Sequence, residues 1–263
     1  MTATEERLRA HGLTLPEGFS IVSYDERRDL DPAIDAFHVG NFEPFMSEDE
    51  IADTGFHAAY DDRPEFQFIL LDPADRIVGV GTSMPLWWDG SDDGLPAGWD
   101  DQILHSLADR EGGREPNTLG AILIIVARGE RGAGHSGTIL GAFRAAARAA
   151  GYRAVIACVR PTWKERYPLT PIERYAAWRR EDGLPYDPWI RLHVRLGGRI
   201  VRPSPESMVV RGSVADWRSW TGLDFLDSGP YVIRGGTSPV TIDLDRDEGV
   251  YFDQNVWVVH DLG

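Results

Sequence analysis

Apolar and polar residues alternate along this chain with two periods, one helical and one typical of strands. Helical spacing before residue 120 covers residues 4–11, 31–45, 48–60 and 99–108. Strand-like runs in the same part cover residues 19–24, 66–71 and 77–81. The last two runs flank the turn Asp-Pro-Ala-Asp-Arg at residues 72–76, which indicates a β-hairpin. Ser47, with Glu50 three positions later, predicts a capping box at the start of the third helix.

The most distinctive segment spans residues 118–151. An apolar, β-branched run is followed by Arg131-Gly132-Ala133-Gly134-His135-Ser136-Gly137 and then by an alanine-rich amphipathic helix. Glycines between a strand and a helix allow a sharp turn that leaves backbone N–H groups unpaired at the positive end of the helix dipole. The segment therefore predicts a phosphate-binding loop.

Two common phosphate loops do not fit this segment. A P-loop would end in Gly-Lys-Ser/Thr, but Lys164, the only lysine of the chain, lies far from the glycines. A Rossmann fingerprint would place a carboxylate at the end of the next strand, which instead has the sequence Ala-Cys-Val-Arg-Pro at residues 157–161. Neither a P-loop nor a dinucleotide fold is favoured.

Residues 131–136 resemble the pyrophosphate loop of the GNAT-type acyl-CoA acyltransferases, whose pattern is Arg/Gln-x-x-Gly-x-Gly/Ala. Ser136 departs from the last position of the pattern but is still small. The predicted order of strand, two helices, hairpin, central strand, glycine loop, helix and strand is also similar to that family, over residues 19–211.

The resemblance implies an α/β (α+β) fold. We expect a mixed, mostly antiparallel central sheet whose fourth and fifth strands splay apart, with helices on both faces. Short strands at residues 231–233, 240–242 and 255–259 would form a β-rich extension over residues 212–263, packed onto the main sheet or crossing a dimer. Residues 1–263 are expected to form a single domain.

The resemblance also implies that acetyl-CoA or another acyl-CoA is the co-substrate, and it implies no metal. Ile125, Val126 and Ala127 would form the strand end that pairs with the pantetheine arm, and an N–H there would stabilise the tetrahedral oxyanion. The pyrophosphate would be held at Arg131, Gly132, Ala133, Gly134, His135, Ser136 and Gly137. The side chain of His135 is expected at the loop surface.

The segment 189–198 resembles the late helix of the family, which ends in a Tyr-x-Lys-x-Gly-Phe type motif. His193 falls where many members have the tyrosine that protonates the departing thiolate. An imidazole, with an unperturbed pKa near ~6.5, exchanges protons at neutral pH more readily than a phenol does. The alternative is a helix-face histidine bonded to a backbone carbonyl.

Residues 160–188 form a longer connection than most family members have. It is expected to contain a helix over residues 172–180 and to shape the acceptor pocket. Thr162 follows the strand directly, close to the expected position of the acyl group. Glu173 and Asp187 are candidate bases for an amine acceptor. Each also has a structural explanation, because Thr170 and Glu173 form a capping-box pattern and Asp187 precedes Pro188 at a helix start.

Three functions follow from these residues. The leading hypothesis is direct transfer of an acyl group, with acetyl favoured, from acyl-CoA to a small amine. The alternative is a malonyl-CoA-type decarboxylase and S-acyltransferase acting with an acyl-carrier protein or thiol. Thr162 with His193 resembles the GNAT-like loading domains of polyketide synthases, and Trp87 and Trp88 would supply an aromatic wall. The third is a non-catalytic acyl-CoA-binding protein.

The charge and composition of the chain narrow the classes of molecule that it could bind. A formal net charge of −15 disfavours nucleic acid and anionic membranes and slightly favours a cationic acceptor. Coenzyme A is an anion, so its binding site must be locally positive in spite of the net charge. The candidates for this positive charge are Arg128, Arg131, Arg160, Lys164 and Arg166. Cys158, the single cysteine, lies in a predicted buried strand and excludes an intrachain disulfide.

Two further features bear on where the protein works and how it is shaped. The chain has no apolar run near the roughly 20 residues of a membrane helix, and its amino-terminal residues do not resemble a signal peptide. We therefore expect a cytoplasmic protein. The sequence leaves open whether the protein forms a homodimer. The acidic, glycine-rich residues 89–98 are interpreted as a solvated excursion in preference to a lid.

Overall fold

The computed structural model describes residues 1–39 and 41–263. Its strands form a single sheet in the order β1-β2-β3-β4-β5-β9-β8-β7, and β6 also pairs with β9. The strands are β1 Ser20–Ser23, β2 Phe68–Leu71, β3 Ile77–Leu86, β4 Thr118–Val126, β5 Ala154–Val159, β6 Arg199–Gly212, β7 Gly229–Tyr231, β8 Val240–Asp243 and β9 Glu248–Asp261. The α-helices are α1 Ala3–Ala10, α2 Asp31–Val39, α3 Glu50–Asp62, α4 Trp99–Glu111, α5 His135–Ala149, α6 Ile172–Ala176, α7 Pro188–Arg195 and α8 Val214–Thr221.

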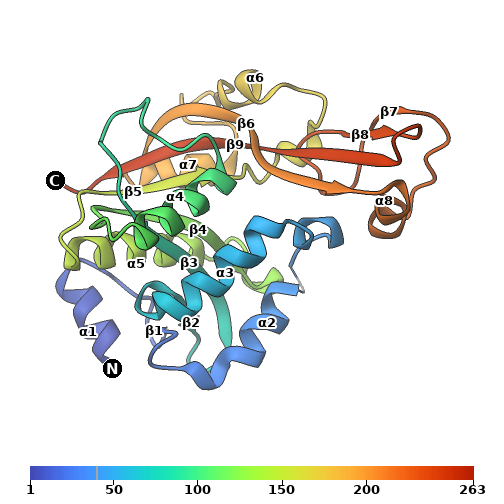
Figure 1. The fold of residues 1–263 in the computed structure, drawn as a ribbon. Helices are drawn as coiled ribbons and strands as arrows, with labels where there is room; N and C mark the ends of the chain where they lie inside the picture. Colours follow the sequence, from blue (N-terminus) through green and yellow to red (C-terminus); the bar gives the residue numbers. More distant parts are fainter. Residues whose placement is uncertain (40) are drawn as a thin grey trace.

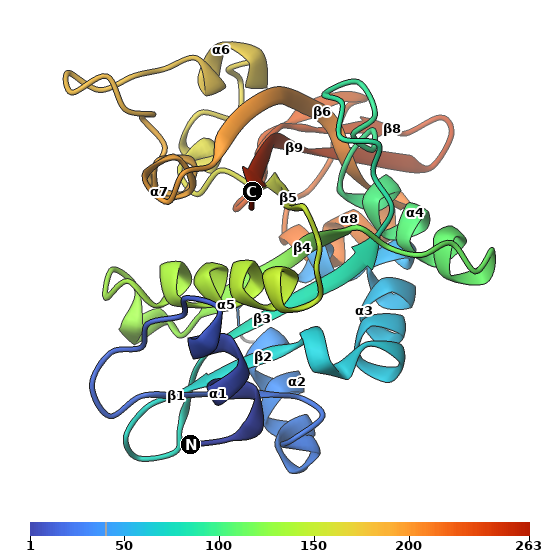
Figure 2. The ribbon, with the colours of Figure 1, turned by 90° about the vertical axis from the view of Figure 1, so that its left-hand side faces the viewer.

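Helices cover both faces of the sheet, as expected. Figure 2 shows α1 and α5 on one side of the sheet and α3 and α4 on the other. Successive residues of β5 explain why its sequence is apolar throughout: Val155, Ala157 and Val159 face the core under α5, while Ala154, Ile156 and Cys158 face the core under α3 and α4.

The parallel pair of β4 and β5 is short. Their register begins at Thr118 opposite Ala154 and ends at Ala121 opposite Ala157. Beyond that point β4 stays paired with β3, and β5 stays paired with β9. The two strands therefore diverge over their carboxyl-terminal ends, which is the predicted splay.

The last part of the chain completes the central sheet. β9 lies between β5 and β6 and pairs antiparallel with both of them. Figure 1 shows β9, in red, running along both neighbours before it extends toward β8 and β7. Residues 212–263, expected to form an extension, thus supply a strand of the main sheet.

The start of α3 and the end of α2 differ from the prediction. Asp49 caps α3 by accepting a hydrogen bond from the Ala52 amide at 2.7 Å, whereas Ser47 ends the 3-10 helix Pro44–Ser47. The capping box predicted from Ser47 and Glu50 is therefore wrong, because a second capping residue stands two positions later. The helix predicted over residues 31–45 ends at Val39, and residue 40 lies outside the described residues.

The helix predicted over residues 172–180 is only the five-residue α6. Its N-cap is Pro171, whose side chain offers no acceptor, so the predicted capping box of Thr170 and Glu173 does not form. After α6 the chain turns back through a bridge between Arg179 and Pro185.

Residues 89–98 pack against β6. Arg202 donates to the carbonyls of Leu95 and Pro96 at 3.0 and 2.8 Å, and Ser204 donates to the carbonyl of Ala97 at 2.8 Å. These contacts tie residues 95–97 to the sheet, while residues 89–94 are exposed, as the interpretation of a solvated excursion predicts.

Within residues 1–39 and 41–263, no helix combines the length and the apolar character that crossing a bilayer would require.

Candidate active site

The divergence of β4 and β5 opens a cavity of about 940 Å³. Its walls include the end of β4, the end of β5 with the residues that follow it, the loop before α5, helices α2, α3 and α7, and β9. Segments that lie far apart in sequence therefore meet around one space, which contains the predicted splay.

The backbone of β4 presents every second N–H group to this cavity. The Ala127 amide donates to the Val78 carbonyl at 2.9 Å, and Ile125 stands opposite Val80 in the same β3–β4 ladder. Because alternate residues of a strand point their amides to opposite neighbours, the N–H groups of Ile124 and Val126 face the gap left by β5. Both residues line the cavity. Of the three predicted residues, Val126 has its amide toward the gap, Ile125 and Ala127 have theirs toward β3, and Ile124 was missed.

The loop before α5 has the backbone geometry of an anion cradle. Gly132 and Gly134 have φ angles of 90° and 91°, and the space where a Cβ atom would stand is empty at both. Within the described chain, no protein group accepts from the amides of Gly132, Gly134, His135 and Ser136. The first turn of α5 carries no acidic residue that would oppose an anion at this helix N-terminus.

Only part of the predicted loop reaches the cavity. Arg131, Gly132 and Ser136 line it, whereas Ala133, Gly134, His135 and Gly137 are not in its lining. A Cβ atom at Gly137 would stand 3.7 Å from Leu192 of α7, so this glycine sits at a helix–helix contact.

His135 is buried, with 4% of its surface exposed, which corrects the expectation that it lies on the loop surface. Its ring packs against Phe19 with centroids 5.0 Å apart, and Nε2 lies 3.5 Å from a carboxylate oxygen of Glu130. As the first residue of α5 it points toward the sheet and holds the loop against the core.

His193 on α7 lines the cavity and is 1% exposed. Its Nδ1 lies 2.9 Å from Nε2 of His260 on β9, and the Trp189 ring packs against it with centroids 4.4 Å apart. Its Nε2 is buried and has no hydrogen-bond partner in the described chain. Burial, with a smaller contribution from His260, lowers the pKa of His193 well below its usual value, so the ring is neutral at pH 7. The alternative of a backbone-bonded helix-face histidine is wrong, because the partner is a second imidazole.

Thr162 also lines the cavity, so the structure brings it and His193 to the same space. Glu173 is exposed on α6 and is not in the lining, so the structure does not bring it to the cavity. The short α6 and the turn after it direct this carboxylate toward solvent.

Asp187, the other candidate base, is 2% exposed and fully engaged. One carboxylate oxygen accepts from the amides of Trp189 and Ile190 at the start of α7, as the helix-start interpretation predicted. The other oxygen accepts from the Trp163 amide and the Tyr175 hydroxyl. These four bonds leave it a structural role.

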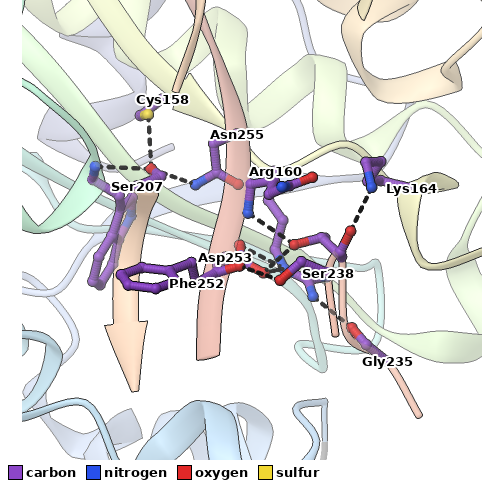
Figure 3. A network of polar contacts seen from close by, with 12 residues as sticks. Cys158, Arg160, Lys164, Ser207, Gly235, Ser238, Phe252, Asp253 and Asn255 are labelled. Carbon is purple, nitrogen blue, oxygen red and sulfur yellow. Dashed lines mark hydrogen bonds and ion pairs between the residues drawn. The ribbon is translucent and has the colours of Figure 1, made fainter. Parts of the chain in front are cut away.

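A buried polar network holds the chain after β5 (Figure 3). Arg160 donates through Nε to both carboxylate oxygens of Asp253, at 3.0 Å each, and through Nη2 to the Gly235 carbonyl. Asp253 is 1% exposed and also accepts from the hydroxyls of Thr237 and Tyr251. The network fixes Arg160 at the wall of the cavity.

The other predicted cations and aromatics have different places. Lys164 is fully buried, donates to the carbonyls of Tyr167 and Thr237, and has its pKa lowered to about 8 by that burial. Of the five cations predicted for coenzyme A, the lining contains Arg131 and Arg160. Trp88 is in the core, and Trp87 stacks under Arg114, so neither forms the predicted aromatic wall.

The wall formed by α2 and α3 was not predicted from the sequence. It presents four carboxylates and three aromatic rings to the cavity, namely Asp31, Asp35, Asp53, Asp61, Phe56, Tyr60 and Trp99, the last from α4. The spacing of Asp31 from Asp35, and of Phe56 from Tyr60, puts each pair on one helix face, a signal that was present in the sequence. His260 carried no such signal, because its partner lies 67 residues away.

The chain is similar to known proteins over nearly its whole length. It is 29% identical over 287 aligned residues to the arginine N-acetyltransferase avaD of Aspergillus versicolor, an alignment that covers 97% of this chain and 98% of the relative. No family model matches it. Among solved structures, it superposes on the loading GNATL domain of CurA from Lyngbya majuscula with a TM-score of 0.59 at 17% identity, over 93% of this chain and 98% of that domain. The splayed sheet, the glycine loop at α5 and the superposition show that the chain has the GNAT fold.

Proposed function

We propose that this protein transfers an acyl group, acetyl in the first instance, from an acyl-CoA to an amine of a small cationic acceptor. The observation that carries the proposal is a single cavity that joins an anion cradle, a splayed strand end and an acidic wall. An anionic thioester donor and a cationic acceptor would meet in it at the ends of β4 and β5.

The donor half of the cavity suits coenzyme A. The free amides of Gly132, His135 and Ser136 and the guanidinium of Arg131 offer positive groups to a pyrophosphate. The exposed backbone edge of β4 would pair with the pantetheine arm. The N–H groups of Ile124 and Val126 are then available to stabilise the oxyanion of the tetrahedral intermediate.

The acceptor half suits a cation. Asp31, Asp35, Asp53 and Asp61 give α2 and α3 a negative face, and the rings of Phe56 and Tyr60 lie on the same wall. Carboxylates and aromatic faces both attract an ammonium or guanidinium group. The relative from Aspergillus versicolor is an arginine N-acetyltransferase, which agrees with an acceptor of this charge.

The attack is direct, without a covalent acyl-enzyme. Cys158 is the one thiol of the chain and lines the cavity, but burial raises its pKa to about 12, so it is not a thiolate nucleophile. His193 is a neutral imidazole in the cavity lining, and Thr162 contributes a hydroxyl to the same lining. Proximity of donor and acceptor in one cavity would supply much of the rate.

The test is a coupled assay of free CoA thiol with acetyl-CoA and a panel of amines that includes arginine, agmatine, a neutral amine and an anionic amino acid. We expect turnover with the cationic amines and an N-acetyl product by mass spectrometry. Asp35→Asn should raise the KM for the cationic amine several-fold and leave the KM for acetyl-CoA unchanged. Asp224→Asn, an exposed carboxylate outside the cavity lining, is the matched control. No CoA release with any amine would refute the proposal.

The second candidate function is decarboxylation of a malonyl-type acyl-CoA followed by S-acyl transfer to an acyl-carrier protein or thiol. It is favoured by one observation, that Thr162 and His193 line the same cavity. Malonyl-CoA incubated without any amine separates the two functions. Release of carbon dioxide supports the second function, and unchanged malonyl-CoA removes it.

A further inference from the structure

His193 and His260 form a buried pair at the wall of the cavity. Their facing nitrogens, Nδ1 of His193 and Nε2 of His260, lie 2.9 Å apart, and both residues are 1% exposed. The two outer nitrogens, Nε2 of His193 and Nδ1 of His260, have no well-formed hydrogen bond in the described chain. Unpaired buried polar atoms are rare in folded proteins, and a matched pair of them needs an explanation.

Both rings are neutral at pH 7. Burial lowers the pKa of His193 well below its usual value and that of His260 to about 4. A neutral imidazole carries one N–H and one lone pair. The 2.9 Å contact therefore contains a single proton, and its position decides whether Nε2 of His193 is a base or a donor.

Two positions of this proton fit the geometry. In one of them, Nε2 of His260 has the lone pair and accepts from Nδ1–H of His193, which leaves the lone pair of His193 on Nε2. A reaction in which His193 first takes a proton from the amine requires that arrangement.

We propose that His260 is a positioning residue that holds the proton of His193 on Nδ1, so that Nε2 of His193 is the base for the attacking amine and the acid for the departing thiolate. This inference rests on the proposed function, and it replaces the carboxylate base expected from the sequence.

The proton is conserved through the reaction. The neutral amine attacks the thioester carbonyl, a C–N bond forms, and the nitrogen loses one proton to Nε2 of His193. The C–S bond then breaks, and the same proton passes from Nε2 to the sulfur, which gives an amide and free CoA thiol. The imidazolium formed between these steps is stabilised by donating through Nδ1 to His260.

Other titratable groups pack on the pair or share its cavity, among them Glu165, an exposed carboxylate of the lining. Trp189 packs on the His193 ring, and Arg144 on α5 acts on His260 from behind and lowers its pKa further. Among the carboxylates expected or found nearby, Asp187 is fully bonded, Asp253 is paired with Arg160, and Glu173 is outside the cavity.

The experiment compares His260→Gln with His260→Leu. The glutamine amide can still accept from Nδ1–H of His193, whereas leucine cannot. We expect kcat to fall roughly 100-fold in His260→Leu and by less than about 10-fold in His260→Gln. Calorimetric affinity for acetyl-CoA should not change in either variant, and thermal unfolding reports whether each is folded.

The pH profile adds a readout that a structural role would not move. In the wild type, the acid limb of kcat/KM should lie well below the usual pKa of histidine, because burial lowers the pKa of His193. Because a neutral His260 accepts from Nδ1–H and so favours the His193 imidazolium, the acid limb should lie at lower pH in His260→Leu than in His260→Gln, whose amide still accepts. An unchanged profile, with equal losses of kcat in both variants, would overturn the inference.

Nitrogen-15 NMR of the imidazoles tests the proton position without turnover. We expect the wild-type His193 to be protonated on Nδ1 and unprotonated on Nε2, with His193→Gln used for assignment. The opposite tautomer overturns the inference even if amines are acetylated. If no amine is acetylated, the proposed function fails, and the tautomer is still measured.

Discussion

Gly134 and Gly151 bound the same helix, α5, with left-handed backbones of φ 91° and φ 75°, and neither has an atom within 4 Å of the place where a Cβ would stand. Gly134 precedes the first turn at the cavity, and Gly151 follows the last turn. A residue other than glycine would be strained to the same degree at both positions. Gly134 belongs to the loop of free amides, whereas Gly151 lies at the opposite end of the helix.

Gly134→Ala should therefore lose acyl-CoA affinity at least 10-fold, because its methyl group enters the cradle of free amides and strain shifts them. Gly151→Ala is the matched control. Each substitution should lower the free energy of unfolding by about 1–2 kcal/mol, the strain of a left-handed alanine. Calorimetry with acetyl-CoA and chemical denaturation measure the two effects. Equal affinity losses in both variants would contradict a phosphate-binding role for the loop.

Asp253→Asn should destabilise the protein by about 3 kcal/mol, since it leaves the Arg160 charge without its buried partner. It should also lower kcat, because Arg160 fixes the chain that follows β5 at the cavity wall. Urea denaturation and steady-state kinetics are the measurements. Asp243→Asn, an exposed carboxylate at the end of β8 that pairs with Arg246, should change stability by less than about 0.5 kcal/mol. If Asp253→Asn changed neither the stability nor kcat, the network of Figure 3 would be dispensable.

Asp100 gives stability a pH dependence. Burial, with repulsion from Asp49, raises its pKa to about 7, above the value near 4 of an unfolded chain. The native state thus binds this proton more tightly than the unfolded state. The contribution to stability is complete below about pH 4, falls as the pH rises toward 7, and is absent above that, a loss of at most about 4 kcal/mol.

Asp100→Asn removes this loss. It should be more stable than the wild type at pH 8 and should show a flatter dependence of unfolding free energy on pH between 4 and 7. Its amide oxygen can still accept from the Val209 amide, as Asp100 does at 3.0 Å. Asp101→Asn, on the next position of α4, is the control. If the free energy of unfolding of the wild type instead rose by this amount between pH 4 and 7, the predicted direction of the effect would be reversed. That result would refute the assignment to Asp100.

Cys158→Ala should keep kcat within about 3-fold of the wild type. The thiol lies 3.1 Å from the Ser207 hydroxyl inside the cavity wall, and its raised pKa makes it a poor nucleophile. Intact-mass spectrometry after rapid quenching with acetyl-CoA should find no acetylated enzyme. An adduct on Cys158 would instead indicate a covalent intermediate.

Local chemistry made part of the site predictable. The Gly132 and Gly134 loop and the apolar strand before it are adjacent in sequence, so pattern alone located the cradle and the splayed strand end. Which amides face the gap depends on the pairing of β4 with β3, and that is why Ile124 was missed and Ala127 was included.

The acceptor half depended on contacts that sequence does not display. Glu173 was a candidate base on a helix expected to reach residue 180, with a capping box as its structural alternative, but Pro171 is the N-cap and α6 ends at Ala176. His260 joins the site only because β9 lies beside β5, a pairing between segments about a hundred residues apart in the chain.

The position of β9 has a consequence for how activity is acquired. Both Asp253 and His260 belong to this strand, whereas the cradle and the splayed strands come from residues 118–159. A chain without residues 248–261 would lose the ion-pair partner of Arg160, the imidazole beside His193 and core side chains such as Val256 and Trp257. Acyl-CoA binding and turnover would therefore both depend on the last long-range strand pairing of the sheet.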